Sequence, residues 1–272
     1  MCRWLSVSRS GYYKWRTRDD STNQQRKRLV EAAVSTTFNT FNHCYGAPRL
    51  TVELNEAGID CSVNYIAKIM AEQGLQAKNG KGYKYFPSIN ARKNVSDNLL
   101  ARNFTASKPN EKWTSDITYI KLERGFVYLA VVMDLYSRKI IGWSLDTTMT
   151  NQLIIDAFNM AVATRKVEPG LILHSDRGVQ YRSGEYQYLL INEGIKPSMS
   201  RKGNCWDNAA MESFFARLKV EHIYPQNLKG KQEAYVCVFG YIETFYNTIR
   251  RHSANDYKSP NNYENEYYEN CA

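Results

Sequence analysis

The amino-acid sequence predicts an α/β protein with a mixed five-stranded sheet, helices on both faces, a helical region before it and C-terminal helices after it. Three strand-like segments at 113–122, 126–134 and 139–145 are separated only by turns, which is typical of an antiparallel meander. Helical segments then alternate with short apolar runs, and this alternation indicates further strands connected by helices. Such connections place helices on both faces of a mixed sheet.

Two basic segments lie before the predicted sheet. Residues 1–40 form a lead-in in which 24–38 has helical spacing. The residues expected on the buried face of this helix are Leu29, Ala33 and Val34. Residues 78–105 form a linker in which lysines and arginines are interleaved with aromatic residues. Such a stretch either follows a phosphate backbone or is a solvated connection between domains.

Residues 41–77 contain the start and stop signals of two short helices. Gly46 and Pro48 open the first helix, and Ser62 is placed to cap a second helix that Gly74 ends. The residues expected to face inward from the second helix are Val63, Ile66, Ala67, Ile69 and Met70. The outward candidates for nucleic acid are Asn64, Tyr65 and Lys68. This layout fits a DNA-binding helix-turn-helix or an ordinary helical hairpin.

The remaining chain divides into a core at 106–222 and a helical extension at 223–272. After the meander, the core is expected to contain a helix at 151–164, an apolar strand at 171–173, a helix at 183–193 and a last strand at 195–199. Five strands and their connecting helices are enough for one well-buried domain.

Composition narrows the class of protein. Lys+Arg 36 against Asp+Glu 27 gives a formal charge of +9, which favours a polyanionic partner because binding to phosphates releases counterions. No apolar run approaches the roughly 20 residues that span a bilayer, and no secretory signal follows Met1, so we expect an intracellular protein with no membrane partner. The six cysteines lack CxxC spacing, which predicts reduced thiols without a zinc site.

Three acidic residues are the candidates for chemistry. Asp116 lies within the first predicted strand, Asp176 follows the fourth, and Glu212 opens a helix after Asp207 and Asn208. Neighbouring strands lie about 4.8 Å apart, so acids far apart in sequence can share one site. Each acid alone has a structural explanation, as a strand-edge residue, a turn former and a first-turn helix residue respectively.

The position of Glu212 around its predicted helix follows from the rotation per residue. At about 100° per residue, one stripe carries the apolar side chains, and Glu212 lies at roughly a right angle from the centre of this stripe. The members of the stripe are Met211, Phe214, Phe215, Leu218 and His222. Lys219 is seven residues after Glu212, about 20° short of two full turns, so both share one face. A cation beside the carboxylates could hold a DNA phosphate.

Three clustered carboxylates suit hard divalent cations. Mg²⁺ and Mn²⁺ prefer oxygen ligands, and two such ions roughly 3.5–4 Å apart activate the attacking oxygen and stabilise the leaving oxygen of an in-line displacement. Without metal the carboxylates repel one another, which raises the pKa of at least one. The sequence therefore predicts Mg²⁺ or Mn²⁺, as two ions, bound by Asp116, Asp176 and Glu212.

Five motifs resemble the catalytic frame, OrfB, of bacterial insertion-sequence transposases of family three. They are WTSDITYI, VVMDLYSRKIIGWSL, HSDRGVQY, SMSRKGNCWDNAAMESFFARLKVE and ETFYNTIRRHSAN. The similarity also includes MCRWLSVSRSGYYKW and YGAPRLTVELNEAG, so it covers nearly the whole chain. That family belongs with the retroviral integrases in the DDE superfamily, which implies a ribonuclease H-like core.

The resemblance implies roles for individual residues. Asp116, Asp176 and Glu212 would be the catalytic, metal-binding triad, and Lys219 the basic residue that binds DNA beside it. Asn208, one turn before Glu212, would cap its helix or contact DNA. Asp134 ends the second strand before a turn, and we interpret it as a turn former without metal. The remaining candidates for DNA contact are Arg177, Arg201, Lys202, Arg250, His252 and Lys68.

The resemblance also implies an activity and its partners. The family cleaves the 3′ ends of its element and joins each 3′-OH to another phosphodiester by direct transesterification. Expected partners are the terminal repeats, target DNA, further copies of the chain, and an upstream-frame protein or its frameshift fusion, in the bacterial cytoplasm at the nucleoid. A hydrolytic nuclease of the same fold and a non-catalytic DNA-binding regulator remain the alternatives.

Overall fold

The computed structural model describes residues 4, 7–78, 95–201 and 205–271, which form two compact units, Met1–Lys78 and Asn79–Ala272. Most of the predicted basic linker, and Lys202 among the candidate residues, lie outside the described residues. The finer domain boundaries predicted from the sequence stay predictions.

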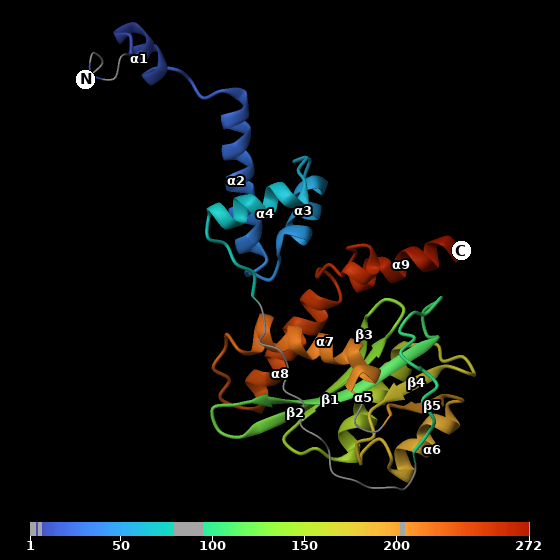
Figure 1. The fold of residues 1–272 in the computed structure, drawn as a ribbon. Coiled ribbons are helices and arrows are strands. Elements are labelled where there is room, and N and C mark those ends of the chain that lie inside the picture. The colour runs from blue at the N-terminus through green and yellow to red at the C-terminus, as the bar shows by residue number, and fades with distance from the viewer. Residues whose placement is uncertain (1–3, 5–6, 79–94, 202–204, 272) are drawn as a thin grey trace. The chain divides into compact units, whose positions relative to one another are not determined.

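The first unit is helical (Figure 1). Its helices are α1 (Arg9–Arg16), α2 (Thr22–Thr40), α3 (Ala47–Glu56) and α4 (Val63–Glu72). Ser21 forms a capping box with Gln24 at the start of α2, and the Ser62 side chain accepts a hydrogen bond from the Tyr65 amide at the start of α4. Gly74 follows α4 at φ +67°, a left-handed conformation that suits glycine. The two predicted helices of this region are therefore present, and Ser62 caps the second.

The core of the first unit differs in detail from the predicted faces. The buried stripe of α2 consists of Val30, Val34 and Phe38, whereas Leu29 is 57% exposed. The prediction for Leu29 was wrong because the true stripe lies one position further along the helix. Likewise, Ile66, Ile69 and Met70 of α4 are buried, but Val63 and Ala67 are exposed.

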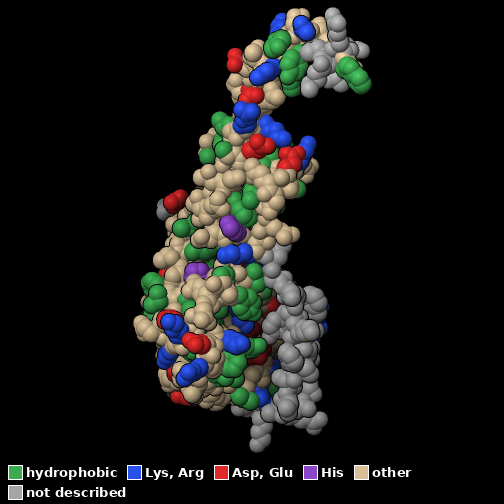
Figure 2. Space-filling model, turned by 90° about the vertical axis from the view of Figure 1, so that its left-hand side faces the viewer, with side chains coloured by type: hydrophobic (Ala, Val, Ile, Leu, Met, Phe, Trp, Pro, Cys, Tyr) green, Lys and Arg blue, Asp and Glu red, His purple; other side chains and the backbone are tan. Residues whose placement is uncertain are grey.

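Helix α1 has no buried residue. Trp15 is 72% exposed and Tyr13 57%, with Lys14 and Arg16 in the last turn. The space-filling view shows hydrophobic and basic side chains together at this end of the first unit (Figure 2).

The second unit is built on a five-stranded sheet (Figure 1). The strands are β1 (Lys112–Lys121), β2 (Phe126–Asp134), β3 (Ile140–Asp146), β4 (Ile172–Ser175) and β5 (Lys196–Met199). Their order is β3-β2-β1-β4-β5; the first three are antiparallel neighbours, and β4 and β5 run parallel to β1. The predicted meander followed by two helix-connected strands is thus confirmed.

Helices cover both faces of this sheet (Figure 1). Helices α5 (Asn151–Thr164) and α6 (Gly184–Asn192) connect β3 to β4 and β4 to β5, and pack in a core with Trp113 and Val132. On the other face, α7 (Ala209–Leu218) and α8 (Lys231–Phe239) pack in a second core. The residues that this second core takes from the sheet include Ile120, Leu129, Val131 and Trp143. The sheet is therefore buried on both sides, as predicted.

The chain after α7 is irregular before it returns to helix. Lys219–Ile223 and Gly240–Tyr246 are π-helical turns, and α9 (Pro260–Cys271) ends the described chain. The Asn247 side chain holds this segment to the sheet, since it accepts a hydrogen bond from the Ile140 amide and donates one to the Ile140 carbonyl, both at 2.9 Å.

The π-helical turn after α7 corrects the predicted apolar stripe. Met211, Phe214, Phe215 and Leu218 are buried as predicted. His222 is only partly buried, and Glu221 is buried instead. A π-helical turn has more residues per turn than an α-helix, which changes the side chain that points inward.

Two predictions from composition can be compared with the structure. Across the described ranges, no helix is long and apolar enough to cross a membrane. Cys44, Cys61, Cys237 and Cys271 are free cysteines, in agreement with the prediction of reduced thiols.

Candidate active site

The register between β1 and β4 places two of the predicted acids beside each other. Within the described residues, the parallel pairing of these strands ends with Thr114 opposite His174. Asp116 and Asp176 each lie two residues beyond that pair, on neighbouring segments. Side chains two apart on a strand share a face, so Asp116 points to the same face as Thr114.

The third acid comes from the helix on that face. Glu212 lies in the first turn of α7 and is partly buried. The Asn208 side chain, just before α7, links the helix start to β1, because its Oδ1 accepts a hydrogen bond of 2.6 Å from Thr114 Oγ1. Asn208 occupies the N-cap position of α7 as predicted, but its side chain makes no cap hydrogen bond. It is also 95% buried, which leaves little surface for DNA.

The charges around Asp116 show that the predicted groups converge. Burial raises the pKa of Asp116 well above its usual value, and the carboxylates of Asp176 and Glu212 raise it further. The Ile117 amide, which donates to Asp116 Oδ1 at 2.8 Å, and the ammonium of Lys219 act in the opposite direction. Asp116 is therefore within electrostatic range of an acid after β4, an acid on α7 and a lysine after α7.

Asp176 is held by the turn that follows it. Burial raises its pKa, while the Gly178 amide lowers it by donating to Oδ1 at 2.8 Å. The cation of Arg182, a residue only 9% exposed, also lowers the pKa of Asp176. Arg182 did not figure among the predicted site residues, although it directly follows the HSDRGVQY motif, six residues after Asp176.

Tyr181 is a second neighbour that sequence reasoning missed. Its hydroxyl is 2.9 Å from Ser115 Oγ. Burial raises the pKa of Tyr181 well above its usual value, and the charges of both Asp116 and Asp176 raise it further. This phenol thus lies near both aspartates, and its place in the HSDRGVQY motif was the available signal.

Lys219 approaches the site from the start of the π-helical turn. Its Nζ lies 4.7 Å from the centroid of the Tyr119 ring. Burial lowers the pKa of Lys219, and the charge of Asp116 partly opposes this shift. Lys219 and Glu212 thus both act on the charge of Asp116, and their predicted sharing of one helix face stays a prediction.

Asp207, a buried acid five residues before Glu212, binds basic residues that precede it in sequence. Asp207, fully buried, accepts hydrogen bonds from Arg201 Nε and Nη2 at 3.0 and 2.9 Å, from Arg102 Nε at 3.0 Å, and from Asn98 Nδ2 at 2.9 Å. The Arg201 side chain hydrogen bonds lower the pKa of Asp207 most. Arg201, predicted to contact DNA, is thus bound to Asp207, although its side chain is 54% exposed.

The C-terminal motif contributes to the fold, and the burial of Arg250 corrects one further prediction. Arg250 is 1% exposed and donates to both Glu221 oxygens, at 2.8 and 2.6 Å. A guanidinium buried in this way cannot reach a phosphate. His252 Nε2 lies 3.0 Å from the Tyr246 hydroxyl, and His252 is only partly buried. Both side chains were predicted as DNA contacts because the sequence motif is basic; the burial of Arg250 depends on a partner that the motif does not reveal, and a DNA contact of His252 stays a prediction.

Asp134 and Arg177 also have local partners. Asp134 is fully buried, and its oxygens accept hydrogen bonds from the Asn110 and Tyr136 amides. Burial raises its pKa to about 6. Arg177 Nε donates to the Ser200 carbonyl at 2.6 Å, which connects the segment after β4 with the end of β5. Lys68, by contrast, is 72% exposed on α4, 3.8 Å from Glu72.

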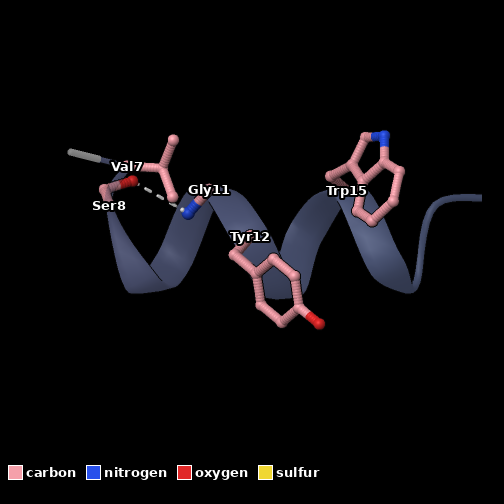
Figure 3. A pocket seen from close by; sticks show the side chains of 5 residues that line it. All are labelled: Val7, Ser8, Gly11, Tyr12 and Trp15. Atoms are coloured by element: carbon pink, nitrogen blue, oxygen red, sulfur yellow. Dashed lines mark hydrogen bonds between the residues drawn. The ribbon is translucent and has the colours of Figure 1, made fainter. Parts of the chain in front are cut away.

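A surface pocket lies on the side of α1 (Figure 3), in the other unit from the acids. It is lined by Val7, Ser8, Gly11, Tyr12 and Trp15. None of these is an acid, a histidine or a cysteine, so this pocket offers no ligand for a hard metal ion.

The donor set of the three acids fits a divalent cation by chemistry. Burial and the neighbouring negative charge raise the pKa of Asp116, which is the effect a bound cation would relieve. In the arrangement of the described residues, no three acidic, histidine or cysteine side chains are close enough to hold one ion together. The acids are therefore neighbours without forming a closed metal cluster.

Comparison with known protein families identifies the class of this fold and site. Residues 106–205 and 193–260 each match an integrase core domain, and residues 24–82 match an HTH-like domain. With the strand order described above, these matches define an integrase core of ribonuclease H-like fold, preceded by a helix-turn-helix-like region. The predicted fold class is thereby confirmed.

Two curated proteins are similar over almost the whole chain. Transposase InsF for insertion sequence IS3A of Escherichia coli strain K12 is 45% identical over 271 residues, which cover 97% of this chain and 93% of InsF. The transposase for insertion sequence element IS904 of Lactococcus lactis is 42% identical over 248 residues, 91% of this chain and 98% of that protein. The chain belongs to the IS3 family of insertion-sequence transposases.

Solved integrase structures are similar at lower identity. In the simian T-cell lymphotropic virus intasome with PP2A subunit B56 gamma, the matched chain has a TM-score of 0.49 and 18% identity, covering 84% of this chain and 73% of that chain. The magnesium complex of the HTLV-2 integrase catalytic core in its trimeric form has a TM-score of 0.45 and 19% identity, covering 58% of this chain and 98% of that chain.

Proposed function

We propose that the chain is a DDE transposase that cuts and joins DNA, with Asp116, Asp176 and Glu212 as the metal-binding catalytic triad. The observation that carries the proposal is the charge environment of Asp116, whose pKa responds to Asp176, Glu212 and Lys219. Because family membership alone does not say which acids act, this convergence supports the choice of these three among the 27 acidic residues of the chain.

In the proposed reaction, water attacks a phosphodiester at the 3′ end of the element. A new P–O bond forms to the water oxygen, and the bond to the 3′ oxygen breaks to leave a 3′-OH. That hydroxyl then attacks a second phosphodiester. A new P–O bond forms to the attacking oxygen, and the bond from phosphorus to the 3′ oxygen of the attacked strand breaks, which leaves a 3′-OH on that strand. No covalent bond to the protein is needed.

The three carboxylates would hold Mg²⁺ or Mn²⁺, as two ions. The metal would supply activation of the attacking oxygen and stabilisation of charge on the leaving oxygen. Lys219, a cation beside the acids, would bind a phosphate of the reacting strand. Asp116 has to be ionised to bind metal, and its raised pKa means that protons compete with the cation for this group.

Recognition of DNA outside the catalytic centre is proposed for the first unit. Helix α4 follows α3 in the segment that matches an HTH-like domain, and the residues exposed on α4 include Asn64 and Lys68. A second helix of this kind lies in the major groove in helix-turn-helix proteins. We also propose assembly of several copies on DNA, which would bring two element ends together. A partnership with an upstream-frame protein and location at the bacterial nucleoid remain predictions.

A strand-transfer assay tests the triad. Labelled duplexes carrying the element ends are incubated with the full chain, Mg²⁺ and target DNA, and cleaved and joined products are separated. Asp116→Asn, Asp176→Asn and Glu212→Gln should each abolish cleavage and joining while binding of the end duplex stays within about twofold, because electrostatic DNA affinity depends on Lys and Arg. Glu185→Gln, an exposed first-turn acid of α6, is the matched control and should react like the wild type.

The same assay separates the alternatives. Cleavage without joining would indicate a hydrolytic nuclease. Binding of end DNA with neither product, together with the absence of Mn²⁺ binding in a titration, would indicate a DNA-binding regulator. Full activity of any triad variant would remove that residue from the triad.

A further inference from the structure

Two exposed aromatic residues lie in the hairpin that follows Asp116, and the alternation of side chains along β1 places Tyr119 on the face of the sheet opposite to Asp116. Tyr119 stands three residues after Asp116 on β1 and is 53% exposed, and Phe126, the first residue of β2, is 48% exposed. Their rings meet edge to face, with centroids 5.5 Å apart and an interplanar angle of 89°. Large aromatic side chains are usually buried, so this exposed pair needs an explanation.

Lys219 connects this pair with the acids. Its Nζ lies 4.7 Å from the centroid of the Tyr119 ring, and its charge also acts on Asp116. Lysine is strongly hydrated and mobile on its four-carbon stem, so contact with the ring restrains the ammonium beside the carboxylates. The part of β1 that carries Tyr119 lies beyond the pairing with β4, which ends at Thr114 in the described structure.

The surroundings are basic. Lys121 and Arg124 are exposed in the same hairpin, between the two aromatic residues in sequence. Aromatic rings beside cations are the combination by which proteins bind single-stranded nucleic acid, with bases stacked on rings and phosphates held by the charges. The same hairpin also exposes Glu123, so Lys219 is the cation that the structure places against a ring.

We propose that Tyr119, supported by Phe126, is a stacking site for a nucleobase of the reacting DNA end, and that Lys219 binds a phosphate of the same strand. The inference rests on the proposed function, which places a DNA strand at Asp116. A base stacks there only when it is unpaired, so the site holds the terminal nucleotides with their pairing opened. Tyr119 is thus a positioning residue for the scissile phosphate.

The test uses fluorescence and joining on the same DNA. A duplex carrying the element's terminal sequence contains 2-aminopurine in place of one of its last bases, moved along the end in separate duplexes. The wild type should quench the fluorescence at one position, because stacking on a ring replaces stacking in the duplex. Tyr119→Ala should abolish this quench and lower joining about tenfold, mainly by raising KM, since a stacked base is worth about 1–3 kcal/mol.

Conservative variants keep the test sharp. Tyr119→Phe should retain quench and joining within about twofold, because the ring supplies the stacking, whereas Tyr119→Leu should behave like Tyr119→Ala. If Tyr119→Ala does not fold, Phe126→Ala is tested instead, and its melting temperature shows that it is folded. Phe126→Ala should weaken the quench. Unchanged quench and joining in Tyr119→Ala or Tyr119→Leu would overturn the inference, as would equal loss in Tyr119→Phe. Quench without any joining by the wild type would reject the proposed function and leave the stacking site standing.

Discussion

Asp116 and Asp176 lie equally far beyond one pair of residues in neighbouring parallel strands, since each is two residues past the Thr114–His174 pair. Their mutual position is therefore set by backbone pairing. Each also accepts a hydrogen bond from a backbone amide nearby, Asp116 from Ile117 and Asp176 from Gly178. The two carboxylates are oriented by the main chain. The stability of the folded sheet has to offset the repulsion between their charges.

Gly178→Ala tests this orientation. A Cβ at position 178 would lie 2.9 Å from Asp176 Oδ1, closer than real Cβ contacts, so the carboxylate has to move. We expect metal-dependent joining to fall about ten- to a hundredfold, because small displacements of reacting groups are costly, while the melting temperature changes little. Gly184→Ala, where an added Cβ meets nothing within 4 Å, is the control. Equal activity of the two variants would contradict the proposed role of the Gly178 turn.

Asp207→Asn tests the anchoring of the segment before α7. The arginine hydrogen bonds lower the pKa of Asp207 in the folded chain, so its ionised form stabilises the fold at neutral pH. This stabilisation is lost as the pH falls below about 4, the ordinary Asp pKa, toward the lower folded value. The variant should lose about 1–2 kcal/mol at pH 7, where hydrogen bonds to a charged group are removed.

Melting curves between neutral and acid pH check this expectation. The gap between wild type and Asp207→Asn should narrow below pH 4. Asp156→Asn, at an exposed position of α5, should show a smaller gap at every pH. A gap for Asp207→Asn that stays constant down to the acid limit would show that its ionisation does not stabilise the fold.

Arg250→Met tests whether the basic C-terminal motif is structural. Burial alone would lower the pKa of Arg250, but its hydrogen bonds to Glu221 raise the pKa overall, so the guanidinium is charged in the folded chain. Removing the arginine takes the guanidinium away from the buried Glu221 carboxylate, which also accepts a hydrogen bond of 2.8 Å from the Tyr241 hydroxyl, and should cost about 3–5 kcal/mol. The double variant Glu221→Leu, Arg250→Met should recover a large part of this loss, because it leaves no unpaired charge.

Chemical denaturation of the three proteins measures these costs. End-DNA affinity is measured in parallel at a temperature where Arg250→Met is folded. If Arg250→Met is as stable as the wild type but binds end DNA more weakly, the result would support the DNA contact first predicted for Arg250.

Local patterns predicted the sheet well. The turn at Glu123–Gly125 and the alternation of β-branched residues placed β1 and β2 within one residue, because these signals belong to neighbours in sequence. The assignment of Asp116 to a strand and Asp176 to the end of another followed directly. That the two acids are adjacent required only the parallel pairing of those strands.

Contacts between residues far apart in sequence could not be predicted from these local patterns. Helical periodicity predicted His222 as the next buried residue after Leu218, but Glu221 is buried because Arg250, 29 residues later, supplies its ion pair. Arg201 and Arg250 were assigned to DNA because exposed basic residues bind phosphate. Arg250 is instead buried against Glu221, while Arg201 pairs with the buried Asp207 and keeps an exposed side chain. Tyr181 was missed because its relation to the aspartates arises from the fold, not from spacing.

Lys219→Gln tests the proposed phosphate contact. Each phosphate that a protein neutralises contributes about −0.9 to the slope of log K against log salt concentration. The variant should bind the end duplex more weakly at low salt, with a slope less negative by about 1. Lys229→Gln, an exposed lysine beyond the π-helical turn, is the control for loss of one positive charge. Binding is titrated at several salt concentrations with two duplexes, one carrying the element's terminal sequence and one in which that sequence is mutated. If the slope of Lys219→Gln equals that of the wild type, Lys219 does not bind a phosphate, and its contact with the Tyr119 ring only holds the π-helical turn in place.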